Sequence, residues 1–309
     1  MKIFFYSFCL IIFLSYFLDS NVHASAPLIK MSYVEVNSNN LSNVGCYLRS
    51  DNLKPFIQIT SIFAANINGN NPEKPEIYFN PQVTKLLNSD YQQITFLQKK
   101  GIKVLITLLG NHQNAGWSCM TNTESKKKFA QNIVNMVNKY NLDGVDIDDE
   151  YSTCVTNESS IADIAQYIKE NPSFKGKLLT KALFSDYFAF SNLKLAKYLD
   201  YGWEMSYFSD NFEQRLNPYL LQYKVKKEKL FLGGSASAGE SYPSPSNITK
   251  YVSNNNFAGV MIYNITTNSQ NYLNQIAQAE YEAKTKTKTK NKIKRINVIV
   301  TQNCLNISL

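Results

Sequence analysis

Segments typical of β-strands alternate with segments typical of helices along most of this 309-residue chain. Apolar residues in the intervening segments recur at i, i+3, i+4 and i+7, with lysines on the other face. The predicted strands are residues 31–36, 56–67, 103–110, 144–150, 177–184, 201–208, 229–236 and 259–266. Strand and helix that alternate eight times within ~250 residues predict an α/β fold, a single (β/α)8 TIM barrel.

A doubly wound open sheet is the alternative fold for such an alternation. That fold usually carries a glycine-rich phosphate loop after its first strand, and neither GxGxxG nor GxxxxGK[ST] occurs there. The glycine-rich segment LGGSASAGES belongs to the seventh predicted strand, where it is only a weak match to a phosphate loop. The barrel therefore remains the favoured fold.

The first two dozen residues have the composition of a secretory signal peptide. Lys2 supplies a positive charge, residues 3–18 are apolar, and VHA or ASA offers small residues for cleavage. We expect cleavage after Ala24, because the alternative site leaves Pro27 directly after the cut. The apolar run is short for the ~20 residues of a membrane span, so we expect an exported protein, secreted or periplasmic, without such a span.

The net charge of +8 is concentrated near the C-terminus. Residues 284–295, KTKTKTKNKIKR, carry seven positive charges and the signal peptide is neutral, so residues 27–283 sum to +1. We therefore predict a signal peptide at 1–24, a barrel at 27–283 and a basic low-complexity tail at 284–309. Lys/Thr alternation is typical of a solvated chain, so no nucleic-acid partner is expected, although attachment of the tail to an anionic surface stays open. The apolar INVIVTQNCLNISL near the end could form a strand.

Histidine and cysteine counts exclude several kinds of site. His112 is the only histidine after removal of the signal, which excludes histidine-rich metal sites and leaves one residue for any Ser-His-Asp triad. Cys46, Cys119, Cys154 and Cys304 form no CxxC pair, so a zinc ribbon is not expected. We expect neither a metal nor a cofactor. Cys119 and Cys154 follow the third and fourth predicted strands, close enough in a barrel for a disulfide. Two unpaired thiols are the alternative.

The segment LDGVDIDDEYS, which starts at residue 142, crowds five carboxylates into a mostly apolar stretch. A solvated acidic loop and a calcium loop are the ordinary explanations. However, Val145 and Ile147 alternate with Asp146, Asp148 and Glu150 at the two-residue period of a strand, and the segment is too short for an EF-hand. The pattern predicts a strand with one apolar face and one acidic face.

In a TIM barrel the acidic face points inward, and catalytic groups lie at the C-terminal ends of the strands. Successive inward carboxylates are then ~6.6 Å apart along the strand. Because they cannot all ionise at this spacing, we expect the inner ones to share protons and the outermost, Glu150, to have a raised pKa. A glutamic acid of this kind at the barrel mouth is suited to general acid catalysis.

DGVDIDDE fits the DxxDxDxE pattern of glycoside hydrolase family 18, the chitinase family. The chain more closely resembles the H/F-type endo-β-N-acetylglucosaminidases of that family, in the segments YVEVNSNNLSNVG, SIFAANIN, GIKVLITLLGNHQNAGW and LDGVDIDDEY. The resemblance covers roughly residues 31–282 and implies hydrolysis of the β-1,4 bond between the two core N-acetylglucosamines of N-glycans. It implies N-glycosylated proteins or free N-glycans as partners of a monomeric enzyme.

The same resemblance implies roles for four residues. Glu150 protonates the glycosidic oxygen while the substrate's own 2-acetamido oxygen attacks the anomeric carbon, the substrate-assisted route of this family. Asp148 orients the acetamide and stabilises the oxazolinium intermediate, and Asp146 tunes Asp148 from below. Tyr207 matches a tyrosine that holds the acetamido carbonyl.

Aromatic and amide side chains are the candidates for sugar binding, since the C–H faces of pyranose rings stack on flat apolar groups. The candidates are Trp203, Tyr263, Phe63, Asn111 and Asn264. For Phe63 a place in the barrel core is equally possible. Two departures from the chitinase pattern, Tyr263 in place of tryptophan and Thr107–Gly110 in place of SxGG, favour the endoglycosidase branch. A chitinase acting on β-1,4-N-acetylglucosamine polymers and a catalytically silent glycan-binding barrel remain alternatives.

Overall fold

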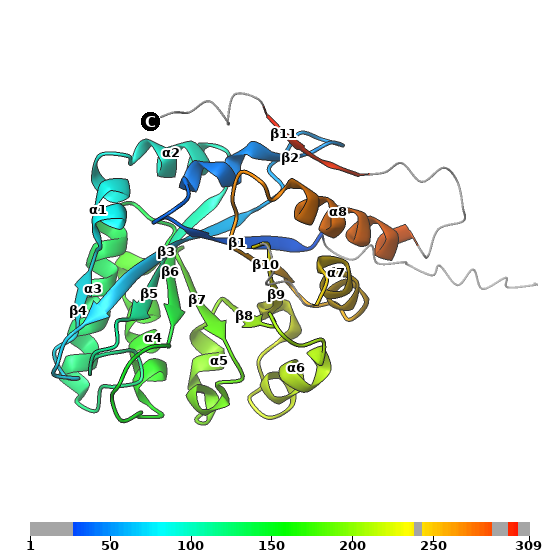
Figure 1. Ribbon diagram of the computed structural model, residues 1–309. Helices are drawn as coiled ribbons and strands as arrows, with labels where there is room; N and C mark the ends of the chain where they lie inside the picture. Colours follow the sequence, from blue (N-terminus) through cyan, green and yellow to red (C-terminus); the bar gives the residue numbers. More distant parts are fainter. Residues whose placement is uncertain (1–26, 238–242, 286–295, 302–309) are drawn as a thin grey trace, which may run out of the picture.

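The computed structural model describes residues 27–237, 243–285 and 296–301, and its central feature is a closed barrel of parallel strands (Figure 1). The eight barrel strands are β1 (Ile29–Glu35), β3 (Ile59–Asn68), β5 (Lys103–Gly110), β6 (Gly144–Asp148), β7 (Leu178–Leu183), β8 (Tyr201–Met205), β9 (Leu230–Ser235) and β10 (Gly259–Tyr263). Each pairs in parallel with the next, and β1 pairs with both β10 and β3, which closes the barrel. The (β/α)8 prediction and all eight predicted strands are confirmed.

The helices surround this barrel, with two departures from the predicted pattern. They are α1 (Pro81–Asn88), α2 (Gln92–Lys99), α3 (Thr123–Lys139), α4 (Ser160–Glu170), α5 (Lys194–Tyr198), α6 (Phe212–Leu221), α7 (Pro245–Asn254) and α8 (Gln270–Thr285). Residues 81–100 form two short helices rather than one. Between β1 and β3 the described chain has no α-helix, only a 3-10 turn (Leu41–Cys46) and the short strand β2 (Tyr47–Arg49).

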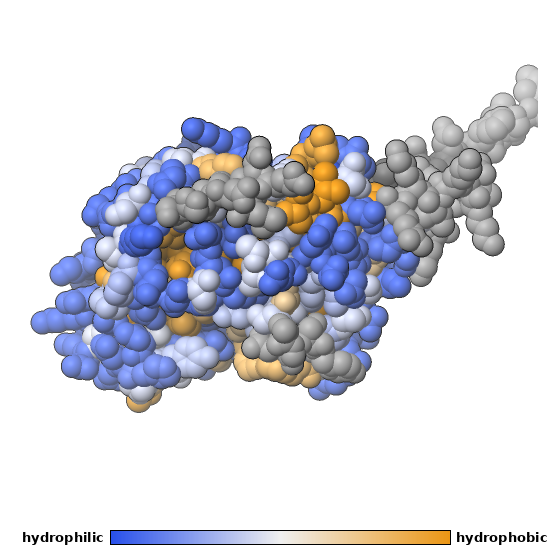
Figure 2. Space-filling view, turned by 45° about the horizontal axis from the view of Figure 1, so that its top comes forward, coloured by the Kyte–Doolittle hydropathy of each residue, from blue (hydrophilic) through white to orange (hydrophobic). Residues whose placement is uncertain are grey.

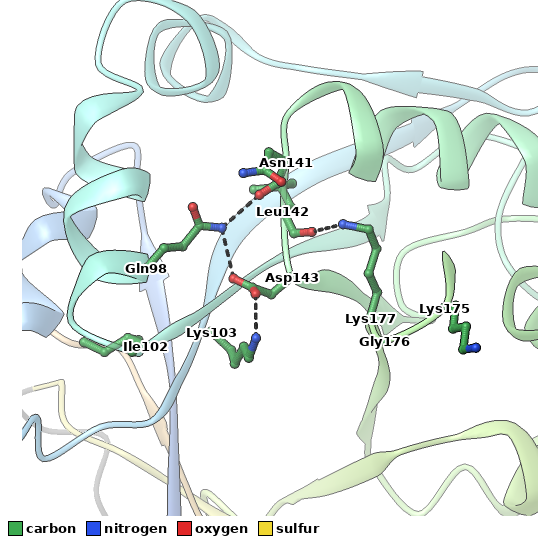
Figure 3. A pocket seen from close by; sticks show the side chains of 10 residues that line it. Gln98, Ile102, Lys103, Asn141, Leu142, Asp143, Lys175, Gly176 and Lys177 are labelled. Carbon is green, nitrogen blue, oxygen red and sulfur yellow. Dashed lines mark hydrogen bonds and ion pairs between the residues drawn. The ribbon is translucent and has the colours of Figure 1, made fainter. Parts of the chain in front are cut away.

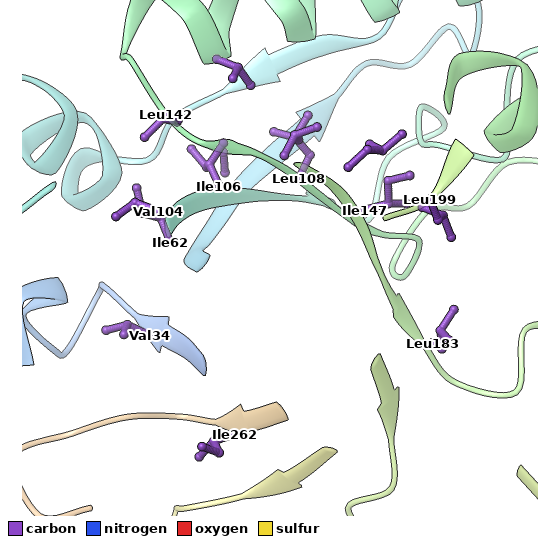
Figure 4. Close-up of a cluster of buried hydrophobic side chains, with 14 of the residues drawn as sticks. Val34, Ile62, Val104, Ile106, Leu108, Leu142, Ile147, Leu183, Leu199 and Ile262 are labelled. Atoms are coloured by element: carbon purple, nitrogen blue, oxygen red, sulfur yellow. The ribbon is translucent and has the colours of Figure 1, made fainter. Parts of the chain in front are cut away.

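The hydrophobic core has two layers, separated by the barrel wall. Outward-facing strand residues, Val145 and Ile147 among them, pack against the helices, and Figure 4 shows part of this outer layer, including Ile147. A smaller cluster fills the barrel interior and includes Met31, Tyr33, Leu105, Trp203, Phe231 and Met261. The apolar face of the acidic strand therefore points outward, as its two-residue period predicts.

The predicted barrel domain ends at residue 283, but described residues beyond this point also pack against the fold. Helix α8 continues to Thr285, and β11 (Val298–Val300) pairs antiparallel with β2. The Val298 side chain is buried, and its backbone N–H donates to Asn274 Oδ1 at 2.6 Å. Figure 2 shows hydrophobic side chains gathered between two grey segments at the place of β11. Within the predicted tail at 284–309, residues 286–295 and 302–309 lie outside the described residues, so the prediction of a solvated chain stays a prediction there.

We expect removal of β11 to lower stability without changing turnover. A chain that ends at Arg295 loses the β2–β11 ladder and the burial of Val298, and the Val298→Ala substitution alone should cost about 2 kcal/mol. The matched control is Ile299→Ala, because Ile299 is only half-buried. Thermal melts and kinetics on a soluble glycopeptide test this, and equal melting of the truncated and full chains would contradict it.

No helix in the described ranges is both long enough and apolar enough to cross a membrane.

Candidate active site

The innermost carboxylate of the acidic strand lies in a cage of hydroxyl groups. Asp146 is fully buried, and its Oδ2 accepts hydrogen bonds from Tyr33 Oη at 2.8 Å and Thr107 Oγ1 at 3.0 Å. Its Oδ1 accepts from Thr180 Oγ1 at 2.6 Å. Thr107 and Thr180 stand beside Asp146 in register on the neighbouring strands β5 and β7. Three donors therefore hold this carboxylate in one orientation.

Sequence reasoning missed this cage, although a signal for part of it was present. Thr107 and Thr180 are polar residues inside otherwise apolar predicted strands, and a polar inward residue beside an inward carboxylate indicates a hydrogen bond. Thr180 lies on the fifth barrel strand, β7, and is the residue by which this strand contacts the acidic site. No site residue on this strand was predicted from sequence.

Asp148 lies one inward position nearer the mouth, and its surroundings differ from those of Asp146. Its side chain is only 3% exposed, and among the described residues its Oδ1 has no hydrogen-bond partner. Burial raises the pKa of Asp148 well above its ordinary value, and the neighbouring charges of Glu150 and Asp146 raise it further. A buried carboxylate oxygen without a partner is costly, so this atom is available to accept a hydrogen bond from a ligand.

Glu150 stands two residues beyond the end of β6, partly exposed at the barrel mouth. Burial is the largest cause that raises its pKa, and the charge of Lys181 opposes the shift. The raised pKa agrees with the expectation for a general acid. Its leading cause is desolvation, however, rather than the repulsion between carboxylates on which the expectation was based.

Asp149 points away from the other three carboxylates. Its Oδ1 accepts hydrogen bonds from the Ser118 backbone N–H at 3.3 Å and from Ser118 Oγ at 3.2 Å. Burial raises the pKa of Asp149, and the charge of Lys181 opposes that effect. Lys181 is itself buried and ion-paired with Asp186. The Asp149 side chain therefore belongs to a polar cluster behind the barrel wall.

Three aromatic rings form a cup at the mouth, called the aromatic cup below: Phe63, Tyr207 and Tyr263. The Phe63 and Tyr263 ring centroids are 5.6 Å apart, and those of Tyr207 and Tyr263 are 6.0 Å apart. Tyr207 Oη donates to Met261 Sδ at 3.8 Å. After burial, the charge of Asp148 is the largest cause that raises the Tyr207 pKa, since ionisation beside that carboxylate is unfavourable. The structure thus brings Tyr207 to the acidic cluster.

The other predicted sugar-binding residues lie outside the aromatic cup. Trp203 lies deeper than predicted: its side chain is fully buried, and its indole N–H donates to Tyr33 Oη at 2.6 Å, so it packs below the acidic residues. Asn111 Nδ2 donates to Asn68 Oδ1 at 2.7 Å, and Asn264 Oδ1 accepts from the Glu35 backbone N–H at 2.9 Å. Both amides therefore connect neighbouring loops at the mouth.

The loop that carries Glu150 is fastened to the loop after β5. Gly110 N–H donates to the Glu150 carbonyl oxygen at 3.1 Å, and His112 N–H donates to the Tyr151 carbonyl oxygen at 2.7 Å. A Cβ on Gly110 would lie 2.3 Å from the Glu150 oxygen, so the approach requires glycine. His112 structures this loop, and its ring lies 5.1 Å from that of Tyr151.

A disulfide between Cys119 and Cys154 joins the same two loops, with Cα atoms 5.6 Å apart. The predicted pairing is confirmed. Cys46 is also disulfide-bonded, and Cys304 lies outside the described residues. The bond between the loops after β5 and β6 restrains the segment that carries Glu150.

One pocket lies at the opposite end of the barrel, where the strands begin. It has a volume of about 450 Å³, and several of its polar groups bond to one another (Figure 3). Asp143 accepts from Gln98 and Lys103, and Lys177 Nζ donates to the Leu142 carbonyl oxygen at 2.6 Å. Catalytic groups of TIM barrels lie at the other end, and this pocket contains none of the residues described above.

The pKa of Asp146 predicts a dependence of stability on pH. Burial raises this pKa from 3.8 to about 6, against the opposing effect of its hydroxyl donors. The folded state therefore keeps a proton that the unfolded state releases, so this stabilisation is complete below pH 3.8 and is lost as the pH rises through about 6. The loss corresponds to about 3 kcal/mol.

The Asp146→Asn variant should lack this part of the pH dependence, because asparagine does not titrate. Urea unfolding of wild type and variant at pH 4 and pH 7 measures the contribution, together with the change that loss of the Asp146 charge makes in the titration of Asp148. An identical change of unfolding free energy in the two proteins would show that Asp146 has an ordinary pKa.

The sequence of this chain matches one protein family and resembles individual members of known function. Residues 29–240 match the family described as Glycosyl hydrolases family 18. An endo-beta-N-acetylglucosaminidase from Flavobacterium sp. (strain SK1022) is 45% identical over 127 residues, which are 41% of this chain and 40% of that protein. Endo-beta-N-acetylglucosaminidase F1 from Elizabethkingia meningoseptica is 40% identical over 127 residues, 40% of this chain and 37% of the relative. The matched region is thus well under half the length of either relative.

Solved structures share the fold at lower sequence identity. Bacteroides thetaiotamicron EndoBT-3987 with Man5GlcNAc product matches with a TM-score of 0.66 and 20% identity, over 89% of this chain and 62% of that chain. A chitinase from Bacteroides thetaiotaomicron matches with a TM-score of 0.64 and 17% identity, over 86% of this chain and 100% of that chain. Both likenesses concern the fold.

Proposed function

The chain belongs to glycosyl hydrolases family 18, and on this premise we propose that it is an endo-β-N-acetylglucosaminidase. Its reaction is hydrolysis of the β-1,4 bond between the two core N-acetylglucosamines of N-glycans. The unpartnered Oδ1 of Asp148 is the observation that carries the proposal. A carboxylate oxygen held beside the mouth matches the N–H of a 2-acetamido group, which only an N-acetylated sugar offers there.

Glu150 is the general acid in the proposed reaction. Its raised pKa keeps it protonated at higher pH than an ordinary glutamic acid, so it can protonate the leaving oxygen. The acetamido oxygen of the substrate attacks the anomeric carbon as that bond breaks, and an oxazolinium intermediate forms. Glu150, now ionised, then takes a proton from the water that attacks the intermediate, which restores the acid and leaves the anomeric configuration retained.

Asp148 and Tyr207 fix the acetamido group during this sequence. Asp148 accepts a hydrogen bond from the acetamide N–H and stabilises the positive charge of the oxazolinium ring. The Tyr207 hydroxyl lies beside the acidic cluster and donates to the acetamido carbonyl oxygen. Asp146, held by its hydroxyl cage, is a positioning residue that acts through Asp148.

N-glycans are favoured as substrates because the relatives from Flavobacterium and Elizabethkingia meningoseptica are both endo-beta-N-acetylglucosaminidases. The replacement of the chitinase tryptophan by Tyr263 points in the same direction. We further propose that the protein is exported, since residues 1–24 have the composition of a signal peptide and the Cys119–Cys154 disulfide requires an oxidising compartment to persist.

A gel-shift assay on an N-glycosylated protein, run beside a chito-oligosaccharide assay, separates the candidate activities. We expect the glycoprotein to shift and the chito-oligosaccharide to remain intact. Cleavage of the chito-oligosaccharide without a glycoprotein shift would identify a chitinase. Binding of either glycan without hydrolysis would identify a glycan-binding barrel.

A further inference from the structure

Three exposed aromatic side chains stand along one arc of the barrel mouth, called the aromatic rim below: Tyr151, Phe184 and Phe208. They are 55%, 50% and 74% exposed. They follow the consecutive strands β6, β7 and β8, and Tyr151 and Phe208 directly succeed Glu150 and Tyr207 in sequence. Large apolar surface exposed beside an active site indicates a binding surface.

The structure holds part of this rim in place. The Arg215 guanidinium lies 5.1 Å from the centroid of the Phe184 ring, and Arg215 Nε donates to Glu204 Oε1 at 2.7 Å. Glu204 is fully buried, and Ser185 N–H, next to Phe184, donates to its other oxygen at 3.4 Å. A buried ion pair thus fixes the segment that carries Phe184.

Tyr151 is held in a comparable way. Its carbonyl oxygen accepts from the His112 N–H, and its ring packs on the His112 ring. The rings of Phe208 and Tyr207 have centroids 6.3 Å apart. Each rim residue therefore keeps one contact with the protein and presents its remaining surface to solvent, so little conformational entropy is lost when a ligand binds.

The position of the rim relative to Glu150 decides which part of a substrate it meets. Strands β6 and β10 are four apart in the closed eight-stranded barrel, so Glu150 and Tyr263 stand on opposite sides of the mouth. In the proposed reaction, Asp148 and Tyr207 hold the acetamido group, which places the sugar that carries it between the aromatic cup and Asp148. The leaving group therefore extends past Glu150, over the ends of β6, β7 and β8, where the aromatic rim is exposed.

We propose that the aromatic rim binds the leaving group, which is the asparagine-linked N-acetylglucosamine together with the polypeptide that carries it. This inference rests on the proposed function. The apolar faces of a pyranose and of peptide side chains both stack on aromatic rings. The enzyme should consequently prefer protein-bound N-glycans to free N-glycans of the same structure.

The test compares two substrates with one glycan: an asparagine-linked glycopeptide and the corresponding free glycan that ends in two N-acetylglucosamines. In the Phe184→Ala/Phe208→Ala double variant, we expect kcat/KM on the glycopeptide to fall about tenfold, the usual size of effect when an aromatic contact is lost. Most of this loss should be a rise in KM. The loss on the free glycan should be about two- to threefold at most. Leu221→Ala is the matched control, because Leu221 is 66% exposed at the far end of α6.

An equal loss on both substrates, or none on either, would show that the aromatic rim does not bind the polypeptide, while leaving the proposed function intact. A loss through kcat alone would also overturn it, because it would indicate displacement of Glu150 or Tyr207. If wild type hydrolyses neither substrate, the proposed function fails, and the inference fails with it.

Discussion

The Glu150→Gln variant should lose about 10²–10⁴-fold in kcat on an N-glycosylated substrate. Glutamine has the size of glutamic acid but no proton to donate to the leaving oxygen. Because Glu150 lies at the mouth and is only partly buried, the barrel should fold and bind glycan as before. Single-turnover kinetics measure the loss, and calorimetry with a glycopeptide measures the affinity.

Glu158→Gln is the matched control, since Glu158 is an exposed carboxylate in the same loop. Its kinetics should equal those of wild type. Near-normal turnover by the Glu150→Gln variant would show that Glu150 is not the general acid.

Asp148→Asn should lose about 10²–10³-fold in kcat, the usual effect of removing one preorganised electrostatic contact to a transition state. The asparagine side chain still fits the pocket, but it no longer carries the charge that stabilises an oxazolinium ion. Asp149→Asn should change kcat only a few-fold, because asparagine keeps the Oδ1 that accepts from Ser118.

The two neighbouring substitutions remove the same charge one residue apart, so their difference reports which side of β6 faces the substrate. Steady-state kinetics on one glycopeptide and thermal melts of both variants provide the comparison. An equal loss at the two positions in proteins of equal stability would contradict the assigned register.

The barrel could be predicted from sequence because its signals are local. Each strand is a short, mostly apolar run, β-branched in several cases, and alternation along β6 correctly placed Val145 and Ile147 against the helices. The break between α1 and α2 and the β2–β11 pairing were not predictable in the same way. The pairing joins residues about 250 positions apart, and no local pattern specifies such a partner.

Depth along a strand limited the prediction of site residues. Trp203 and Tyr207 share one face of the same segment, so their parity alone could not distinguish them. Trp203 lies inside β8 and is fully buried, whereas Tyr207 lies two residues beyond its end and reaches the acidic cluster. Where a strand ends depends on its neighbours in the sheet, and these are set by the tertiary fold.

Mass spectrometry of the products from an asparagine-linked glycopeptide tests the central claim most directly. We predict a peptide that retains a single N-acetylglucosamine and a released glycan that lacks it. Release of the whole glycan from asparagine, removal of terminal sugars only, or an intact glycopeptide would each contradict cleavage between the two core N-acetylglucosamines.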